Sequence, residues 1–317
     1  MLTHFVSVMF LTLAALTLAP RAMASNIPFT LTEDGYITVP LEIGGVEAPC
    51  FILDTATRRF GVTNQMANRH WAERVFEGTL NHISSGGKLR LPLAKLHRIR
   101  FGDHEIETGY AAIFPDRAEA GVISCGLVGF DAYHGYVMRL NGPEKRLELT
   151  AHSGNLARAG WRIITAEYNN QGALMIDTSY QGQQVTVMLT TGLKHSMMDF
   201  ATARRLMPEH FKTDPNNPRN VLVTDPHDTI PSNIGLVARE RTYETLLLTD
   251  FHVGGWALGD VEVAVAPLPV RDQTGYIDAP LIMLGADILA HKDFALDTRA
   301  HQLWVPPAEG IQHTASQ

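Results

Sequence analysis

The chain has 317 residues, of which 45% are hydrophobic and 19% are charged, and its formal net charge is −7. This length suits one large domain or two of ordinary size, and the composition is typical of a folded protein. The net negative charge and the lack of a basic cluster exclude nucleic acid as an expected partner.

Residues 1–24 are predicted to be a signal peptide. Phe5 to Ala19 is an apolar stretch, and Ala22-Met23-Ala24 provides small residues for cleavage before Ser25. The alternative is an uncleaved membrane anchor, for which the stretch is short. Cleavage predicts a periplasmic or secreted protein without stable membrane insertion.

The chain has two cysteines, Cys50 and Cys125. Export to an oxidising compartment permits a disulfide between them, and two buried free thiols are an equally ordinary alternative. Neither cysteine belongs to a Cys-x-x-Cys motif, and the 14 histidines form no His-x-x-x-His pair, so we expect no metal site. Ser84–Lys88 (SSGGK) lacks the rest of a phosphate-binding loop, and we expect no cofactor.

The first half of the mature chain opens with a predicted β-hairpin. It runs along Tyr36–Ile43, turns at Gly44-Gly45 and returns through Cys50–Leu53 to Asp54. Pro40 predicts an edge position for the first of these strands, because proline cannot donate to a strand ladder.

The second half repeats this order. Its hairpin runs along Ala173–Thr178, turns at Gln181-Gly182 and returns through Val185–Leu189 to Thr190. A short helix is predicted after each hairpin, at Thr63–Trp71 and at Asp199–Leu206. The segment Lys212–Ser232 carries four prolines and is predicted to be a surface loop, either a tolerated insertion or a substrate-specific element.

Spacing indicates an internal repeat. Gly102 precedes Pro115 by 13 residues, and Gly254 precedes Pro267 by 13 residues. Gly129 and Gly285 are 156 residues apart, and so are Leu147 and Leu303. The sequence therefore predicts two copies of one mostly β unit, residues 25–150 and 158–307, followed by a tail at 308–317.

Two motifs in each unit carry a family resemblance. They are FILDTAT at 51–57 with VGFD at 128–131, and MLTTG at 188–192 with LGADIL at 284–289. An apolar strand ending in Asp-Thr-small, followed later by apolar-Gly-x-Asp, resembles the retropepsin-like aspartic proteases, and the resemblance covers nearly all of the mature chain. It implies an all-β fold of two tandem units related by a pseudo-twofold axis, as in the pepsin-like relatives.

The resemblance also implies an active site where one loop of each unit meets the other beneath β-hairpin flaps. Asp54 is the expected catalytic residue, and the supporting loop residues are Thr55, Ala56, Thr190, Thr191 and Gly192. The threonines after the catalytic positions are expected to lock the two loops together by hydrogen bonds. The flap residues, expected to cover an extended polypeptide, are Ser84, Ser85, Gly86, Gly87, Asn233, Ile234 and Gly235.

The chain departs from the family pattern twice. Ala56 replaces a glycine, which is a mild change if its φ is negative and an awkward one otherwise. Thr190 replaces the second aspartate. Asp177-Thr178-Ser179 also looks like the motif, but it precedes the hairpin turn and is predicted to lie on the outer strand.

The chemistry of the family needs two carboxylates that share one proton, one acting as base on a water and one as acid. Asp54 facing Thr190 leaves several alternatives. These are weak hydrolysis by Asp54 alone, a homodimer that pairs Asp54 with its copy, and a site that binds polypeptide without chemistry. A further alternative is that Asp54 is only a structural carboxylate, hydrogen-bonded by loop amides.

Other residues are assigned simpler roles. Asp131 and Asp287 follow the late glycines and are expected to be structural. His195 lies near the Thr190 loop, where it is either a proton donor or an ordinary surface or core histidine. Trp71, Trp161, Trp256 and Trp304 are expected to pack in the core or at sheet edges.

Overall fold

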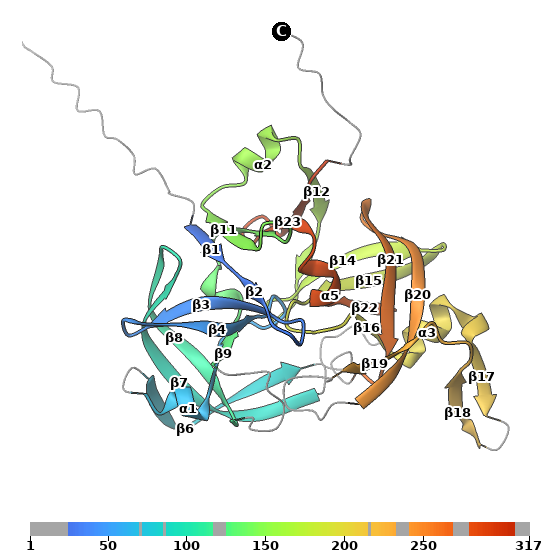
Figure 1. The fold of residues 1–317 in the computed structure, drawn as a ribbon, viewed down its shortest axis with the longest axis horizontal. Helices are drawn as coiled ribbons and strands as arrows, with labels where there is room; N and C mark the ends of the chain where they lie inside the picture. The colour runs from blue at the N-terminus through green and yellow to red at the C-terminus, as the bar shows by residue number, and fades with distance from the viewer. Residues whose placement is uncertain are drawn as a thin grey trace, which may run out of the picture.

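The computed structural model describes residues 25–69, 72–84, 87–116, 125–214, 217–232, 241–268 and 279–307. Within these ranges the protein is all-β, with several sheets and only short helices (Figure 1). The predicted signal peptide and the predicted tail at 308–317 lie outside the described residues. In the part of the chain that the structure describes, no helix is both long and apolar enough to cross a membrane.

Each half of the chain builds an eight-stranded sheet, and the two sheets have the same strand order. The first sheet runs β2 (Thr30–Leu31), β3 (Ile37–Ile43), β4 (Val46–Leu53), β9 (Gly126–Val128), β5 (Phe60–Thr63), β8 (His104–Phe114), β7 (Gly87–Phe101), β6 (Ala72–Ser84). The second runs β13 (Glu167–Tyr168), β14 (Leu174–Tyr180), β15 (Gln183–Leu189), β22 (Leu281–Leu284), β16 (Met197–Met198), β21 (Trp256–Val265), β20 (Arg241–Val253), β19 (Thr229–Ser232).

The strand register repeats as well. β4 runs parallel to β9 with Leu53 opposite Val128, and β15 runs parallel to β22 with Leu189 opposite Leu284. The next residues along β4 and β15 are Asp54 and Thr190. The pairing therefore places these two residues at equivalent strand ends.

A six-stranded sheet joins the halves. Its order is β1 (Ser25–Pro28), β11 (Arg146–Thr150), β10 (Val137–Asn141), β23 (Asp293–Asp297), β24 (Gln302–Val305), β12 (Arg162–Thr165). The central pair, β10 and β23, comes from different halves and runs antiparallel with Arg139 opposite Ala295. These two residues are 156 positions apart, which is the offset of the internal repeat. The two halves of the chain therefore contribute equivalent strands on either side of the centre of this sheet.

Alternating side chains divide each eight-stranded sheet between two apolar clusters. On β15, Val185, Val187 and Leu189 face the main core, whereas Met188 belongs to a second cluster. Every other residue of a strand points to the same face. Asp54 and Thr190 thus follow strand ends that are buried on both faces.

Two predictions about these elements need correction, and a third is confirmed. The strand β3 lies inside its sheet, and Pro40 is accommodated where the β3–β4 register shifts between Val39 and Leu41. The helix predicted over Thr63–Trp71 is only α1 (Asn64–Ala67), which ends before β6 begins at Ala72. The second helix, α3 (Phe200–Leu206), has Asp199 as its N-cap, as the predicted boundary required.

The segment predicted to be a surface loop at Lys212–Ser232 forms strands. β17 (Phe211–Asp214) and β18 (Asn217–Val223) pair as a separate hairpin beside α3, and β19 follows (Figure 1). Pro218 falls where the register of this hairpin shifts, and Pro231 lies on the edge strand β19. Proline is tolerated at both kinds of position because no ladder hydrogen bond is lost there. Pro218 and Pro231 therefore mark an irregularity and an edge, whereas Pro226 lies in the short loop between β18 and β19.

Cys50 and Cys125 form a disulfide, which resolves the alternative that the sequence left open. Their Cα atoms are 5.4 Å apart, at neighbouring positions of the parallel strands β4 and β9. These two strands lead directly to Asp54 and to Gly129. The disulfide thus fastens the half of the chain that carries the acid.

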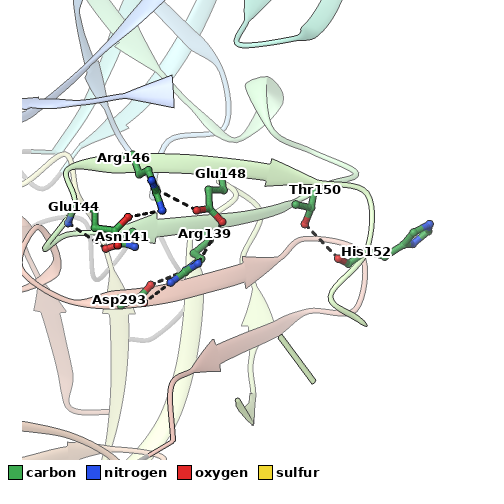
Figure 2. Close-up of polar contacts among 8 residues, drawn as sticks. All are labelled: Arg139, Asn141, Glu144, Arg146, Glu148, Thr150, His152 and Asp293. Carbon is green, nitrogen blue, oxygen red and sulfur yellow. Dashed lines mark hydrogen bonds and ion pairs between the residues drawn. The ribbon is translucent and has the colours of Figure 1, made fainter. Parts of the chain in front are cut away.

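A charge network spans the centre of the six-stranded sheet (Figure 2). The Arg139 guanidinium donates two hydrogen bonds to Asp293, at 2.9 and 2.7 Å, and one to Glu148 at 3.3 Å. It also lies 5.0 Å from the ring centroid of Trp161. The bonds to Asp293 raise the pKa of Arg139 above its ordinary value. Arg139 comes from the first half and Asp293 from the second, so this pair ties the halves together.

We expect Arg139→Ala to lower the free energy of unfolding by about 2 kcal/mol, between the values of exposed and buried ion pairs. The loss arises because Asp293, whose side chain is 23% exposed, loses both of its hydrogen bonds from Arg139, and Glu148 (22% exposed) keeps only its ion pair with Arg146. Urea denaturation measures the difference. Arg158→Ala is the control, since this exposed arginine hydrogen-bonds Asn155 within its own helix α2 (Gly154–Arg158) and forms no ion pair among the described residues. Equal losses for the two variants would contradict the prediction.

Candidate active site

Asp54 ends β4 at the junction between the two halves. Its backbone N–H donates to Val128 O at 2.9 Å, and its side chain is buried, with the residue only 8% exposed. The carboxylate accepts one hydrogen bond on each oxygen, from Ala56 N at 2.9 Å and from Thr57 Oγ1 at 2.6 Å. These two hydrogen bonds satisfy and orient the buried carboxylate.

Thr190 has the same backbone environment at the end of β15. Its N–H donates to Leu284 O at 2.9 Å, which matches the Asp54 bond to Val128. Leu193 takes the position that Thr57 has in the first loop, three residues on. The second loop therefore has neither a carboxylate at this position nor a hydroxyl three residues later.

Thr55 and Thr191 join the two loops by four reciprocal hydrogen bonds. Thr191 Oγ1 accepts from Thr55 N at 3.2 Å and donates to Leu53 O at 2.7 Å. Thr55 Oγ1 accepts from Thr191 N at 3.1 Å and donates to Leu189 O at 3.0 Å. Both residues are almost completely buried. We call this set of four bonds the threonine lock.

Gly192 lies directly against the Asp54 side chain. A Cβ atom built on Gly192 would be 2.3 Å from Asp54 Cγ and 2.5 and 2.6 Å from its oxygens. The Asp54 carboxyl group thus occupies the space above the second loop, and only glycine fits there. Ala56 has no positive φ, so its side chain is accepted without backbone strain in place of the family glycine.

The threonine lock also bears on the homodimer alternative. The positions that a second Asp54 loop would occupy are filled by Thr191 and Gly192 of the same chain. Pairing two Asp54 residues would break four buried hydrogen bonds within each chain. The structure gives that alternative no support.

The Asp287 side chain holds the segment that follows the second loop. It accepts hydrogen bonds from Ser196 N and Ser196 Oγ, both at 2.8 Å, and from Ile288 N at 3.0 Å. Burial raises the pKa of Asp287 to about 6, although these bonds oppose the shift. Burial also raises the pKa of Asp131, its counterpart, which lies 4.0 Å from Arg58. Both aspartates hold loops, in the structural role that the sequence predicts.

His195 precedes Ser196 and is half-buried. Burial and the neighbouring Lys194 lower its pKa, which favours the neutral imidazole. A neutral imidazole is a poorer proton donor, so this environment does not supply the acid that Thr190 lacks.

The raised pKa of Asp287 predicts a pH-dependent stability. The unfolded chain ionises this group near its ordinary pKa of 3.8, whereas the folded chain ionises it near 6. The stabilisation that the protonated Asp287 gives the folded state is therefore fully present below about pH 4, and it is lost as the pH rises through 6. Wild-type unfolding free energy should fall as the pH rises from 3.5 to 7.5. We expect Asp287→Asn to reduce this fall by about 1 to 2 kcal/mol, measured by thermal unfolding at each pH. Asp250→Asn, at a 90% exposed side chain, is the control; an Asp287→Asn profile parallel to wild type would refute the assignment.

The predicted flap residues are only partly within the described structure. Ser84 and Gly87 form the last strand pair of the β6–β7 hairpin, so the first candidate flap has the predicted hairpin backbone. Ser85, Gly86, Asn233, Ile234 and Gly235 lie outside the described residues. The second candidate hairpin is described up to the Ser232–Arg241 pair of β19 and β20.

The chemistry available is that of one oriented carboxylate. Asp54 can hold and deprotonate a water, and the described residues include no group of three or more His, Cys, Asp or Glu suited to a metal ion. The sequence reasoning missed Thr57, whose hydroxyl is the closest partner of Asp54. The signal was a threonine three residues after an aspartate, a spacing that commonly gives side-chain bonds in turns.

Comparisons with known proteins found no relative of this chain. Neither the family models nor the curated proteins gave a match to this chain.

Proposed function

We propose that this chain is an aspartic-peptidase-like protein that binds extended polypeptide at the junction of its two halves. One observation carries the proposal: the threonine lock holds two equivalent loops together and presents the Asp54 carboxylate between them. This arrangement, on two sheets of equal strand order, supports the tandem retropepsin-like fold that the sequence motifs suggest.

Binding is proposed as the main activity because the acid of the dyad is missing. Asp54 can act as a base on water, but peptide cleavage also needs a proton for the departing amine. Thr190 cannot provide that proton at any useful pH. A groove between β-rich halves can still hold an extended chain through backbone hydrogen bonds.

Residual hydrolysis by Asp54 is the second candidate. The observation that favours it is that Ala56 N and Thr57 Oγ1 each donate a hydrogen bond to the Asp54 carboxylate and so orient it. In this reading the chain is a slow endopeptidase. The two candidates share one site and differ only in turnover.

Fluorescent casein separates these candidates. Binding is measured by anisotropy and cleavage by fluorescence release from pH 3 to 7, for wild type, Asp54→Asn and Thr190→Asp. We expect wild type to bind, Asp54→Asn to abolish any cleavage, and Thr190→Asp to increase it. Absence of both binding and cleavage in wild type and in Thr190→Asp would sink the proposal, and cleavage equal in wild type and Asp54→Asn would remove Asp54 from it.

We further propose that the protein works in the periplasm or outside the cell. The predicted signal peptide motivates this, and the Cys50–Cys125 disulfide supports an oxidising compartment. Fractionation of cells that express the full chain, with thiol labelling of each fraction, tests it. Reduced protein found only in the cytoplasm would contradict this localisation.

A further inference from the structure

A cavity in the second half lies outside the candidate active site. It is lined by residues of β14, β15 and α3 and by the two residues before β22, and none of them belongs to the Asp54 or Thr190 loop. Its volume is about 410 Å³, which is within the range of ordinary small-molecule sites. We call it the α3 cavity.

Asp177 supplies a fixed hydrogen-bond acceptor to the α3 cavity. It lies on β14 opposite Thr186 of β15, and Thr186 Oγ1 donates to Asp177 Oδ1 at 2.7 Å. Thr186 is only 3% exposed, so this hydroxyl holds the carboxylate from its buried side. In the described part of the chain, the other oxygen, Oδ2, accepts no hydrogen bond. The Asp-Thr-Ser motif on the outer strand thus presents an unused carboxylate oxygen.

Arg205 brings a positive charge to the same cavity from α3. The helix is tied to β22, because Thr202 Oγ1 accepts a hydrogen bond from Leu281 N at 3.0 Å. Arg205 is three residues after Thr202 and therefore lies on the same face of the helix. On the other side, Pro280 O accepts a hydrogen bond from Thr186 N at 2.9 Å. One hydrogen-bonded frame therefore positions the acid and the base.

The two opposite charges line one cavity without pairing. Among the residues that the structure describes, Arg205 forms no ion pair with Asp177 or with any other acid. Gln184 adds an amide group to the wall, and Ala279 and Pro280 add apolar surface. A simple anion or a simple cation would meet a charge of its own sign here. A ligand that carries both charges satisfies both groups.

At the equivalent positions the first half carries a disulfide. By the offset of the repeat, Cys50 and Cys125 correspond to Thr186 and Leu281, and both pairs are neighbours on parallel strands. The residue of β3 at the place of the acid is Pro40, where the β3–β4 register shifts. These three positions offer neither a hydroxyl nor a carboxylate. The polar lining is therefore a feature of the second half.

We infer that the α3 cavity is a second binding site, and that it takes a zwitterionic ligand of about dipeptide size. The α-ammonium group of the ligand binds Asp177, and its carboxylate accepts charge-assisted hydrogen bonds from the Arg205 guanidinium. Small apolar side chains of the ligand pack against Ala279 and Pro280. This inference goes beyond the proposed function, because the site needs neither Asp54 nor a long polypeptide.

Dipeptides with blocked ends test this inference. Ala-Val, acetyl-Ala-Val and Ala-Val amide are titrated into the full chain and followed by ligand-observed NMR. We expect Ala-Val to bind about 5- to 10-fold more tightly than either blocked form, because each block removes one charged contact.

Two substitutions assign the ends of the ligand. Arg205→Gln should abolish the preference for Ala-Val over its amide and keep the preference over the acetylated form, and Asp177→Asn should do the reverse. Arg204→Gln, on the same helix but outside the lining, and Asp250→Asn, at a 90% exposed side chain, should leave both preferences unchanged. Asp177→Ser replaces Asp177→Asn if that variant fails to fold.

The outcomes are distinct. If Ala-Val does not bind, or binds no more tightly than the blocked forms, the inference is wrong. It is also wrong if both preferences survive both substitutions. Casein binding at the junction of the halves is a separate measurement, so these results leave the proposed function standing or failing on its own.

Discussion

Thr191→Val is expected to destabilise the protein by about 3 kcal/mol. Valine has nearly the shape of threonine, so the change removes the hydroxyl with little change in packing. It leaves Thr55 N without its acceptor and Leu53 O without its donor, in a region where Thr191 itself is 0% exposed. Each buried polar group left without a partner costs about 1 to 3 kcal/mol. Such a loss is a large fraction of the stability of an ordinary domain.

The change should also disturb the position of Asp54, because Leu53, whose carbonyl accepts the hydrogen bond from Thr191, directly precedes Asp54 in the chain. We therefore expect Thr191→Val to weaken polypeptide binding as well as stability. Urea denaturation gives the first quantity and anisotropy the second. Thr38→Val is the matched control: Thr38 is 8% exposed and donates one bond of 3.2 Å to Thr30 O, away from the site.

A double-mutant cycle sharpens this expectation. The Thr55 and Thr191 hydroxyls each make two different bonds, but all four bonds join the same two loops. Once one variant has loosened the loops, the second has less left to disrupt, so Thr55→Val combined with Thr191→Val should cost less than the sum of the single changes. Additive losses would show that the two threonines act independently. Equal losses for Thr191→Val and Thr38→Val would show that the lock is not an important tie between the halves.

Much of the fold followed from spacing. Constant separations between glycines fixed which strands correspond, and the equivalence of Asp54 and Thr190 came from counting along the two hairpins. Strands with a period of two residues permit this, since a shift by one residue would turn every side chain to the wrong face. The match of β4–β9 with β15–β22 reflects that constraint.

The remaining features depend on tertiary contacts that spacing does not encode. The backbone angle of Ala56, the bond from Thr57 to Asp54 and the choice between disulfide and thiols all required atomic positions. Pro40 and Pro218 misled because proline marks irregularities inside sheets as well as edges and loops.

Gly192→Ala is expected to have the largest effect on the site itself. The added Cβ would lie 2.3 Å from Asp54 Cγ, far inside any real contact distance. Asp54 cannot easily yield, because Ala56 N and Thr57 Oγ1 hold its two oxygens. We expect a loss of about 2 to 3 kcal/mol in unfolding free energy, as for an overpacked core. Polypeptide affinity should fall by at least about 10-fold, equivalent to roughly 1.4 kcal/mol.

Removing the obstacle should rescue the variant. In an Asp54→Ala background the carboxyl group is gone, so adding Ala at position 192 should cost much less stability than it does in wild type. Gly154→Ala is the control for a glycine with room, since its nearest neighbour is the end of the flexible Arg158 side chain at 3.8 Å. That change should be neutral or slightly stabilising in a helix. If Gly192→Ala lowers the unfolding free energy equally in both backgrounds, the Asp54 carboxyl group does not contact Gly192. The arrangement of the single-carboxylate site described above would then be wrong.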